Sequence, residues 1–454
     1  MPSDLPYQRK GVRKIHAFGG RALLADEMGL GKTRQALRWL EERPDAQPAL
    51  VVCPSSLKWV WQSEIKEVLG IPCEILNGQK PIRERLHKFQ SITIINYEIL
   101  KYWREWILTM NPKTLILDEV HFCKNPMAKR TRAVRNLAKG IPHIIALSGT
   151  PLLNRPSELW TTVNLIRPDV FDNISLFRWR YCDPIRKPWG WEYKGATNIK
   201  ELHDRLRSTM MIRRLKKHVL PELPPKTRIV IPLEIDNRKD YAEAVSNFLG
   251  WLSKSSTAKA SRASKAEQLT KIGYLKRLAA LGKVDAVIER IESFLEESNG
   301  KLVIMASHRK IIKQLRDNFK GISVVVDGTV TQSKRKRAVH VFQTNKKVRL
   351  FFGQIKVAGV GLSLTAADTL AFAELDWVPG NHIQAEDRIH RLTTKRPVTI
   401  LYWVAKDTIE ETLCKIIQTK QGIVSDTLDG RKGGRNRLNI WNELVNALQR
   451  KDTR

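Results

Sequence analysis

Ala22-Leu23-Leu24-Ala25-Asp26-Glu27-Met28-Gly29-Leu30-Gly31-Lys32-Thr33 is the stretch from which the fold and the chemistry of this chain can be worked out. Its apolar start, residues 22–25, predicts a buried strand, and Lys32-Thr33 open a helical segment that ends near Glu42. A strand, a glycine loop and a helix N-terminus form a phosphate cradle, because backbone N–H groups converge there and the helix dipole favours an anion. Lys32 can reach the β and γ phosphates, and the Thr33 hydroxyl can bind Mg²⁺.

The match to the phosphate-loop pattern G-x-x-x-x-G-K-T is incomplete, because Asp26 stands where the pattern has its first glycine. A surface turn followed by an ordinary helix would give a similar pattern. The decision between the two interpretations depends on whether the rest of the chain supplies the other parts of a nucleotide site.

Length and composition predict a globular protein of two or three domains. The chain has 454 residues, of which 42% are hydrophobic and 28% charged. No apolar run approaches the roughly 18 residues that span a bilayer, so we expect no membrane partner. The N-terminus lacks a basic region followed by an apolar one, so we expect no secretory signal. Five cysteines without a C-x-x-C spacing favour a reducing, cytosolic location and argue against a cysteine zinc site.

The formal net charge of +33 favours a polyanionic partner, since self-repulsion makes such an excess unfavourable otherwise. Residues 301–350 hold thirteen Lys and Arg against two acids, and residues 253–283 hold eight against one. A generally basic surface that serves solubility is the alternative. Nucleic acid is the better interpretation, ahead of an anionic membrane surface, because no amphipathic membrane helix stands out.

Short apolar runs alternate with helical patterns in both halves of the chain, which predicts α/β domains with parallel sheets covered on both faces. In the first half, strands are expected at 22–25, 49–53, 91–96, 114–118 and 143–147, with helices at 57–69, 82–89 and 128–139. In the second half, strands are expected at 302–306, 323–326, 348–352, 369–373 and 398–404, with helices at 310–319, 334–342, 382–391 and 409–420.

Three other segments differ in composition from the alternating strands and helices. Residues 168–198 are rich in aromatic side chains, which fits either a small accessory hairpin with a packed aromatic cluster or a nucleic-acid platform. Residues 211–226 are basic and end in a proline break, which places the inter-domain connection there. Residues 253–267 are low in large apolar side chains, and we expect a mobile basic loop. An amphipathic helix is expected in the tail, with a stripe from Ile440 to Leu448.

Two strand ends carry candidate catalytic groups. The strand at 114–118 leads into Asp118 and Glu119, so that Asp118 can hold Mg²⁺ and Glu119 can orient and deprotonate an attacking water. The strand at 143–147 leads into Ser148 and Thr150, whose hydroxyls could hydrogen-bond the carboxylate pair. A solvated Asp-Glu pair and an ordinary Ser/Gly/Pro turn are the alternatives.

Arg388 and Arg391 are three residues apart in an expected helix, so they share one face. Two guanidinium groups suit the charge that develops on a transferring phosphoryl group. The alternative is a surface on which Glu386 and Asp387 form salt bridges along the helix.

Taken together, these stretches resemble the Swi/Snf (Snf-two) ATPases of helicase superfamily two over nearly the whole chain. The matching stretches are Leu5-Pro6-Tyr7-Gln8, Asp26 to Thr33, Val52-Cys53-Pro54-Ser55-Ser56-Leu57, Asn96-Tyr97-Glu98, Asp118-Glu119-Val120-His121 with Lys124-Asn125, Leu147-Ser148-Gly149-Thr150-Pro151, Gly361-Leu362-Ser363-Leu364-Thr365-Ala366-Ala367, and Gln384 to Arg391. The branch resembled most is that of the Smarcal-type annealing helicases. The stretches that indicate it are Arg180-Tyr181-Cys182-Asp183, Trp189-Gly190-Trp191, Met211 to Lys216 and Phe372-Ala373-Glu374-Leu375.

The resemblance implies two RecA-like lobes with parallel sheets and an ATP site in the cleft between them. The implied domains are an ATP-binding lobe at 1–215, a connector with a basic helical insertion at 216–300, a C-terminal lobe at 301–425 and a basic tail at 426–454. ATP and Mg²⁺ are the implied cofactors. The implied nucleotide-binding residues are Gln8, Asp26, Glu27, Met28, Gly29, Leu30, Gly31, Lys32, Thr33 and Gln384.

The resemblance also assigns roles to the other motif residues. Gln8 would bind the adenine, Lys32 and Glu119 would be catalytic, and Thr33 and Asp118 would hold Mg²⁺. Arg388 and Arg391 would act as arginine fingers across the cleft, so hydrolysis would need lobe closure. The implied coupling residues are Ser148, Thr150 and Gly361, and the implied nucleic-acid contacts are Pro54, Ser55, Lys124, Asn125 and Thr365.

The implied activity is ATP-driven movement along duplex DNA that remodels or anneals it, with double-stranded or forked DNA as the partner of a monomeric motor. A strand-separating DNA or RNA helicase and a non-catalytic basic DNA-binding protein remain as alternatives. The sequence departs from the family pattern at Leu392-Thr393-Thr394, where Ile-Gly-Gln is common, and at Val120, where Ala is usual. Only seven residues precede Gln8, so we expect no N-terminal targeting module and a phage or bacterial origin, with a nuclear location if the source is eukaryotic.

Overall fold

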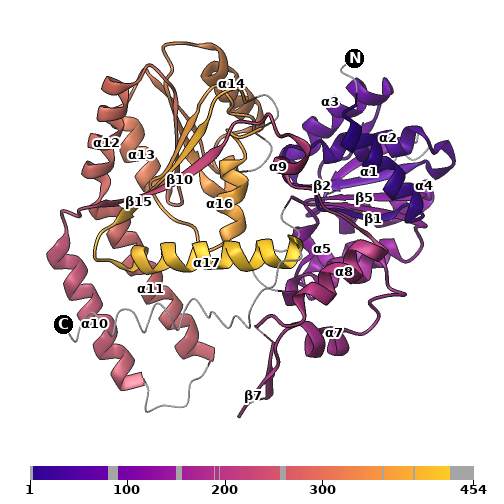
Figure 1. The fold of residues 1–454 in the computed structure, drawn as a ribbon, viewed down its shortest axis with the longest axis horizontal. Helices are drawn as coiled ribbons and strands as arrows, with labels where there is room; N and C mark the ends of the chain where they lie inside the picture. Colours follow the sequence, from indigo (N-terminus) through magenta and orange to yellow (C-terminus); the bar gives the residue numbers. More distant parts are fainter. Residues whose placement is uncertain are drawn as a thin grey trace. The chain divides into compact units, whose positions relative to one another are not determined.

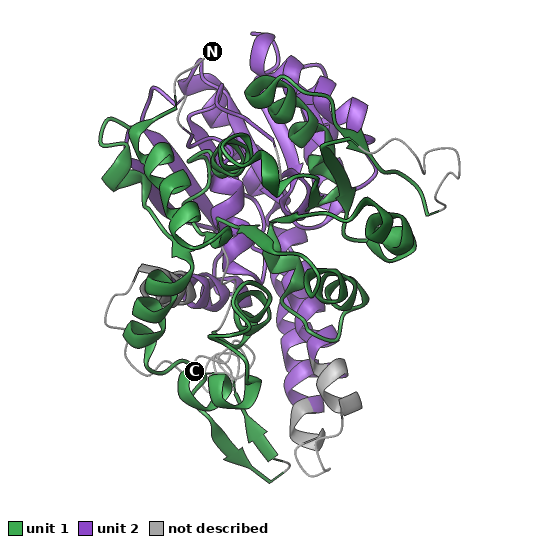
Figure 2. Cartoon of the chain, turned by 90° about the vertical axis from the view of Figure 1, so that its right-hand side faces the viewer, with its two compact units in different colours: residues 1–223, 422–437 green, residues 224–421, 438–454 purple. Residues whose placement is uncertain are grey.

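The computed structural model describes residues 4–79, 90–149, 156–188, 190–193, 195–255, 262–359, 362–391 and 394–429. The chain divides into two compact units, residues 1–223 with 422–437 and residues 224–421 with 438–454 (Figures 1 and 2). Each unit contains its own parallel sheet. Within the described ranges, no helix is long and apolar enough to cross a membrane.

The first unit is built on a seven-stranded sheet in the order β3-β4-β2-β5-β6-β1-β9, in which all neighbours are parallel. Its strands are β1 (Arg21–Leu24), β2 (Ala49–Cys53), β3 (Glu74–Ile75), β4 (Ile92–Asn96), β5 (Thr114–Asp118), β6 (His143–Leu147) and β9 (Met211–Ile212). Its helices are α1 (Pro6–Ala17), α2 (Lys32–Glu41), α3 (Lys58–Leu69), α4 (Arg104–Met110), α5 (Lys129–Ala138), α6 (Trp160–Ile166), α7 (Ile174–Tyr181), α8 (Ile199–Thr209) and α9 (Lys216–Val219).

Helices cover both faces of this sheet, which is why its central strands are apolar along their whole length. In Figure 1, α1, α2 and α3 lie above the strands of this unit, and α5 and α8 lie below them. Leu115 and Leu117 of β5 belong to one buried cluster with Ile107 of α4, Leu137 of α5 and Ile166 of α6. These contacts hold β5 against α4, α5 and α6 on one face of the sheet.

The second unit is built on a six-stranded parallel sheet in the order β10-β15-β14-β11-β13-β12. Its strands are β10 (Lys226–Leu233), β11 (Leu302–Ala306), β12 (Ser323–Val326), β13 (Leu350–Gln354), β14 (Thr369–Phe372) and β15 (Val398–Ala405). Its helices are α10 (Arg238–Ser255), α11 (Arg262–Gly282), α12 (Val284–Glu297), α13 (Arg309–Asn318), α14 (Gln332–Thr344), α15 (Ile355–Ala358), α16 (Pro379–Glu386) and α17 (Ile409–Asp429), of which residues up to 421 belong to this unit.

Alternate residues of the second sheet enter two separate cores. Phe351 and Phe372 pack in a cluster with α11 and α17, whereas Phe352 and Ala371 pack in a cluster with α12 and α13. Both faces are therefore covered, as the continuous apolar strand sequences predict.

The predicted strands at 49–53, 114–118, 143–147, 302–306 and 323–326 are confirmed with the same bounds, and the other predicted strands differ by one or two residues. The predicted helices at 57–69, 128–139, 310–319, 334–342 and 409–420 are also confirmed, with α17 longer than expected. The helix expected at 82–89 and the tail helix lie outside the described residues.

Three predictions differ from the structure. The helix expected to run to Arg391 ends at Glu386, because Arg388 N and Ile389 N donate to carbonyls three residues back, at 3.0 and 3.2 Å, in a turn whose Arg388 carbonyl accepts from Leu364 N at 2.9 Å. The loop expected at 253–267 is helical on both sides of residues 256–261, since its Ala, Lys and Arg are good helix formers. The segment 216–300, predicted as a connector, supplies β10 to the second sheet and three helices to the second unit, while the chain passes between the units after Leu223, inside the predicted connection at 211–226.

The aromatic segment contains a small antiparallel hairpin, β7 (Ile185–Lys187) with β8 (Gly190–Glu192). Phe177 and Tyr181 are buried in the core of the first unit. Trp179 and Trp191 meet edge to face at 4.8 Å and are 53% and 48% exposed. The structure therefore fits the accessory hairpin with a packed aromatic cluster.

Candidate nucleotide site

The loop after β1 is held in an extended form by the chain segment that follows β9. Ala25 N donates to Ile212 O at 2.8 Å, Glu27 N donates to Arg214 O at 3.1 Å, and Lys216 N donates to the Glu27 carboxylate. Gly29 and Gly31 then adopt positive φ angles of 85° and 71°, which L side chains rarely adopt. The loop consequently turns directly into α2, which begins at Lys32.

Lys32 and Thr33 occupy the first turn of α2, as a phosphate cradle requires. Lys32 Nζ donates to the carbonyls of Asp26 at 2.9 Å and Glu27 at 3.2 Å, so it lies across the loop. Gly149, after β6, is close to the same loop: a Cβ built on it would lie 2.2 Å from Met28 Cγ and 3.3 Å from Lys32 Nζ. Its neighbour Thr150 lies outside the described residues.

Asp26 is fully buried and serves as an anchor of the loop. Its carboxylate accepts from Arg214 through both oxygens, with Nε at 2.9 Å, and from Gln35 Nε2 at 3.1 Å. Arg214 also donates to Gln35 Oε1 at 2.6 Å and to the carbonyl of Tyr7, over whose ring it lies. The predicted contact of Asp26 with the nucleotide therefore cannot come from its side chain, which is fully engaged within the protein.

Gln8 lies against the loop, in the first turn of α1. Its Nε2 donates to Leu30 O at 3.4 Å, and its Oε1 accepts from Leu5 N, at the start of the helix, at 2.9 Å. A Cβ on Gly31 would lie 2.3 Å from Gln8 Nε2. Gln8 is thus placed beside the phosphate loop, while its role toward the adenine stays a prediction.

The two predicted carboxylates follow β5 at the same sheet edge. Asp118 accepts from Trp61 Nε1 at 2.8 Å and from Glu119 N at 2.9 Å, and its carbonyl accepts from Tyr97 Oη at 2.8 Å. Burial raises the pKa of Asp118 to about 6, the Glu119 charge adds to this, and Lys32 and Trp61 oppose it. The positive charge of Lys32 therefore favours the ionised form of the Asp118 carboxyl.

A histidine joins the carboxylate pair to the hydroxyl after β6. His121 Nδ1 lies 3.2 Å from Glu119 Oε2 and 3.3 Å from Ser148 Oγ. Glu119 itself has a positive φ of 50°, which turns the chain sharply after the strand. His121 thus lies between Ser148 and Glu119, while the predicted hydrogen bond from the Ser148 hydroxyl to the carboxylates stays a prediction.

In the second unit, the two arginines converge on one backbone carbonyl. Arg388 Nη1 and Arg391 Nη2 donate to Leu362 O at 3.3 and 2.7 Å, and Arg388 Nε donates to Gln384 O at 2.9 Å. Both lie in the turn after α16, where burial lowers the pKa of Arg391. The neighbouring coupling candidate Gly361 lies outside the described residues.

Glu386 contradicts the alternative of a salt-bridged helix surface. It is fully buried and accepts from Lys226 Nζ at 2.8 Å, from Arg228 at 2.8 and 2.6 Å, and from Tyr402 Oη at 2.8 Å. Its partners lie on β10 and β15, so the carboxylate fixes the end of α16 to the sheet. Desolvation opposes its ionisation, but Lys226 and Arg228 hold the pKa of Glu386 well below its usual range.

The predicted nucleic-acid contacts lie on segments that follow strands. Pro54 and Ser55 follow β2, and Lys124 and Asn125 come shortly after β5. Lys124 Nζ lies 3.6 Å from Glu158 Oε1. In the second unit, Thr365 Oγ1 accepts from Gln343 Nε2 at 3.3 Å. Their roles stay predictions.

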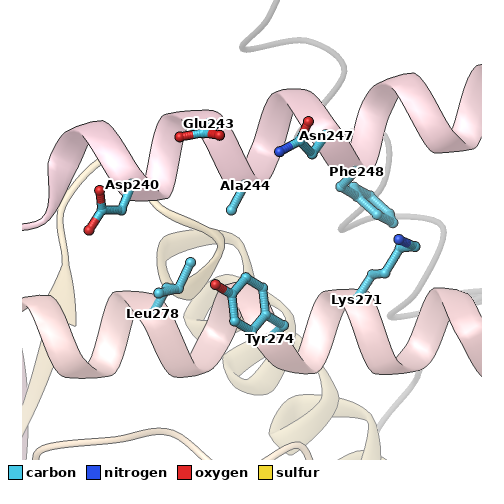
Figure 3. A pocket seen from close by; sticks show the side chains of 8 residues that line it. All are labelled: Asp240, Glu243, Ala244, Asn247, Phe248, Lys271, Tyr274 and Leu278. Carbon is cyan, nitrogen blue, oxygen red and sulfur yellow. The ribbon is translucent and has the colours of Figure 1, made fainter.

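Sequence reasoning missed His121, Trp61 and the Arg214 network as parts of the site. His121 and Arg214 stand in stretches that match the family, so the resemblance includes both residues, but the sequence does not show what either side chain contacts. Trp61 carries no sequence signal, because it is one of two Trp residues on α3 and nothing in the sequence distinguishes it from Trp59. A cleft of about 380 Å³ between α10 and α11, with Asp240 on one side and Lys271 on the other, contains none of the predicted site residues (Figure 3).

Comparison with protein families decides the family. Residues 7–284, more than half of the chain, match the SNF2-related domain, and residues 282–393 match the helicase conserved C-terminal domain. The chain belongs to the SNF2-related family. Its two helix-covered parallel sheets are the two RecA-like lobes that the resemblance implied.

Relatives of this SNF2-related chain include the SWI/SNF-related matrix-associated actin-dependent regulator of chromatin subfamily A-like protein 1 of Xenopus laevis, 35% identical over 92% of this chain and 43% of the relative. They also include the DNA annealing helicase and endonuclease ZRANB3 of Homo sapiens, 33% identical over 94% of this chain and 40% of the relative. The chain thus spans less than half the length of these relatives. The Sulfolobus solfataricus SWI2/SNF2 ATPase core in complex with dsDNA is a structural match at a TM-score of 0.44 and 24% identity, covering 94% of both chains. The predicted Smarcal-type branch is confirmed.

Proposed function

We propose that this chain is an ATP-dependent translocase that hydrolyses ATP to move along duplex DNA and to remodel or anneal it. The observation that carries the proposal is the gathering of Lys32, Asp118, Glu119 and Ser148 at one edge of the first sheet, with His121 joining the last two. This arrangement suits phosphoryl transfer, in which catalysis is mostly positioning and charge stabilisation.

The donor set suits Mg²⁺. Thr33 and Asp118 offer hard oxygen ligands, and the Glu119 carboxylate adds negative charge beside the buried Asp118. Among the described residues no group of three or more His, Cys, Asp or Glu could hold a metal, which fits an ion held by one or two protein ligands and phosphates. Bound Mg²⁺ would neutralise charge on the phosphates, and Glu119 would orient the attacking water.

Arg388 and Arg391 would supply positive charge from the second lobe when the lobes close around ATP, and Gln384 would contribute to the same site. The Leu362 carbonyl and the Glu386 cluster support this role, because they fix the turn that carries both side chains. Removal of such an arginine typically lowers kcat by about 10³ or more.

The relatives support DNA as the partner, since their names include annealing of DNA and regulation of chromatin. Double-stranded or forked DNA, a monomeric motor, and a nuclear location in a eukaryote or a cytoplasmic one in a prokaryote complete the proposal. The contacts of Pro54, Ser55, Lys124, Asn125 and Thr365 are part of it.

The deciding measurement is the ATPase rate with duplex DNA, single-stranded DNA, forked DNA and RNA. We expect duplex DNA to stimulate turnover and Lys32→Ala or Glu119→Gln to abolish it. Turnover that ignores DNA would refute the proposal. A triplex-displacement assay beside a tailed duplex then separates movement along a duplex from strand separation, since a translocase displaces the third strand much better than it unwinds the tailed duplex.

A further inference from the structure

A basic groove lies on the first unit, away from the residues of the proposed nucleotide site. It has a volume of about 240 Å³ and lies between the 3₁₀ turn Leu100–Trp103, the start of α4, and α5. Four cations line it, Lys101 and Arg104 on one wall and Lys129 and Arg132 on the other. Its remaining lining is Leu100, Ala133, Asn136 and Leu137.

Acidic side chains in the described part of the chain do not balance the four groove cations. Over the described part of the chain, no salt bridge involves any of the four groove cations, and no acid lines the groove. Four like charges on one concave surface repel each other, so the groove gains free energy from an anionic ligand.

The groove cations are arranged for extended contact rather than for one small ion. Lys129, Arg132 and Asn136 recur at helical spacing along one stripe of α5, and Lys101 and Arg104 are three residues apart on the facing wall. Lys101 Nζ also lies 4.3 Å from the ring centre of the exposed Tyr102. Parallel rows of lysine and arginine suit the repeated phosphates of a nucleic-acid backbone.

The topology places one end of the groove near the predicted nucleic-acid contacts. The segments after β4 and β5 begin at the same edge of the parallel sheet, where Lys124 and Asn125 also lie. α5 then runs back from this edge along the sheet face. The groove therefore begins beside the predicted contacts and leads away from them.

We propose that the basic groove binds the phosphodiester backbone of a nucleic-acid segment additional to the one contacted by Pro54, Ser55, Lys124, Asn125 and Thr365. This proposal rests on the proposed function and extends it to a second segment of the substrate. An acidic protein segment is the less favoured ligand, because the groove exposes no large apolar side chain as an anchor: Leu100 and Leu137 are buried. A second segment held near the first is what remodelling or annealing of DNA requires.

The test compares two variants with the same loss of charge. One changes Lys101, Arg104, Lys129 and Arg132 to Gln. The control changes Lys10, Arg13, Lys14 and Lys139 to Gln, four exposed cations of the same unit that do not line the groove. Affinity for duplex DNA is measured between about 50 and 200 mM salt, because each phosphate contact contributes about 0.9 to the slope of log K against log salt.

We expect the groove variant to lose about 2 to 4 units of this slope and to need at least about tenfold more DNA for half-maximal ATPase activity, with kcat at saturating DNA within about twofold of wild type. The control variant should change the slope by less than about 1 unit. An equal effect of both variants would show general surface charge rather than a site, and an unchanged groove variant would favour a protein ligand; each overturns the inference. If DNA does not stimulate wild-type turnover, the proposed function fails. If DNA stimulates wild-type turnover but the groove variant behaves like wild type or like the control, only the inference about the groove fails.

Discussion

Replacing Glu386 with Gln tests how the arginine turn of the second lobe is held. The wild-type carboxylate accepts four hydrogen bonds, from Lys226, twice from Arg228, and from Tyr402, at 2.6–2.8 Å. Glutamine keeps the shape of the side chain, but it removes the charge and turns a donor toward groups that are themselves donors. The variant therefore leaves Arg228 without its carboxylate partner and Lys226 with only Asp387, at 3.9 Å.

The size of the effect follows from burial. Removing one partner of a buried ion pair costs about 3–5 kcal/mol, because the other charge stays desolvated. Glu386 is fully buried and the Lys226 side chain is only 17% exposed, but the Arg228 side chain is 41% exposed and can be rehydrated. We therefore expect the lower end of the range, about 3 kcal/mol, which corresponds to about two orders of magnitude in an opening equilibrium.

Hydrogen exchange of β10 and β15 measures this loss locally, which suits a chain of two units better than a single unfolding midpoint. Exchange from both strands should become about 100-fold faster at pH 7, while exchange from β5 of the first unit stays the same. Tyr402→Phe removes one neutral donor and should cost about 1 kcal/mol. Adding Lys226→Met to Glu386→Gln removes one of the two cations that contact Glu386 and should restore part of the loss.

The stability difference between wild type and Glu386→Gln should depend on pH. The folded-state pKa of Glu386 is lowered, so its stabilising contribution is fully present above the unfolded value of about 4.5 and is lost as pH falls from there toward the folded pKa. Wild type and Glu386→Gln should therefore differ fully at pH 6–8 and converge as the solution becomes more acidic than about pH 4.5. A difference below about 1 kcal/mol at pH 7, or one that stays constant with acidification, would refute the reasoning.

Three further substitutions test other contacts. His121→Ala removes the side chain that lies between Glu119 and Ser148. The ratio of kcat with duplex DNA to kcat without it should fall on the order of tenfold, as expected for one lost positioning hydrogen bond. An unchanged ratio would contradict this role of His121. Arg214→Lys loses the bidentate contact with Asp26 that anchors the phosphate loop, so the KM for ATP should rise several-fold with a smaller change in kcat. Steady-state kinetics in which only kcat changes would argue against this anchoring role of Arg214. Lys283→Met leaves the fully buried carboxylate of its partner on α17 uncompensated and should lower the stability of the second unit by about 3–5 kcal/mol in urea unfolding, against a loss under 1 kcal/mol if the pair is unimportant.

The strands could be predicted from the sequence because their signal is local. Residues 49–53, 114–118 and 143–147 are continuous apolar runs, which buried parallel strands require whatever lies around them. β10 gave no such signal: its residues are mostly exposed and include Pro232, which an edge strand tolerates. Its identity as a strand depends on pairing with β15, which follows more than 160 residues later in the sequence.

The end of α16 could not be predicted for a related reason. The residues after Glu386 are helix formers or neutral, so a helix to Arg391 was the reasonable expectation from periodicity. In the structure the helix ends at Glu386. In the turn that follows, Leu364 N donates to the Arg388 carbonyl, and Leu362 O accepts from both arginine side chains. Contacts from a distant loop thus override local propensity and give the two arginines a common partner rather than a common helix face.

The site shows the same division between local and distant causes. Lys32, Thr33, Asp118 and Glu119 were predicted because strand, loop and helix signals surround them. Asp26 was also predicted as a nucleotide contact, but its side chain is occupied by Arg214, which is 188 residues away. A motif therefore identified the right loop, while the physical role of one of its residues depended on a partner that spacing could not reveal.

These contacts also show how the two halves of the proposed ATP site are joined along the chain. Residues 212–216 bond to the phosphate loop between Ala25 and Glu27. The same stretch of chain continues to Pro224, whose carbonyl accepts from His390 Nε2 at 2.9 Å, and to Lys226 and Arg228, which hold Glu386. Only residues 217–223 separate the two bonded ends, although Lys32 and Arg388 are far apart in sequence. A short stretch of chain therefore connects the phosphate-loop partners in the first unit with the partners of the arginine turn in the second unit.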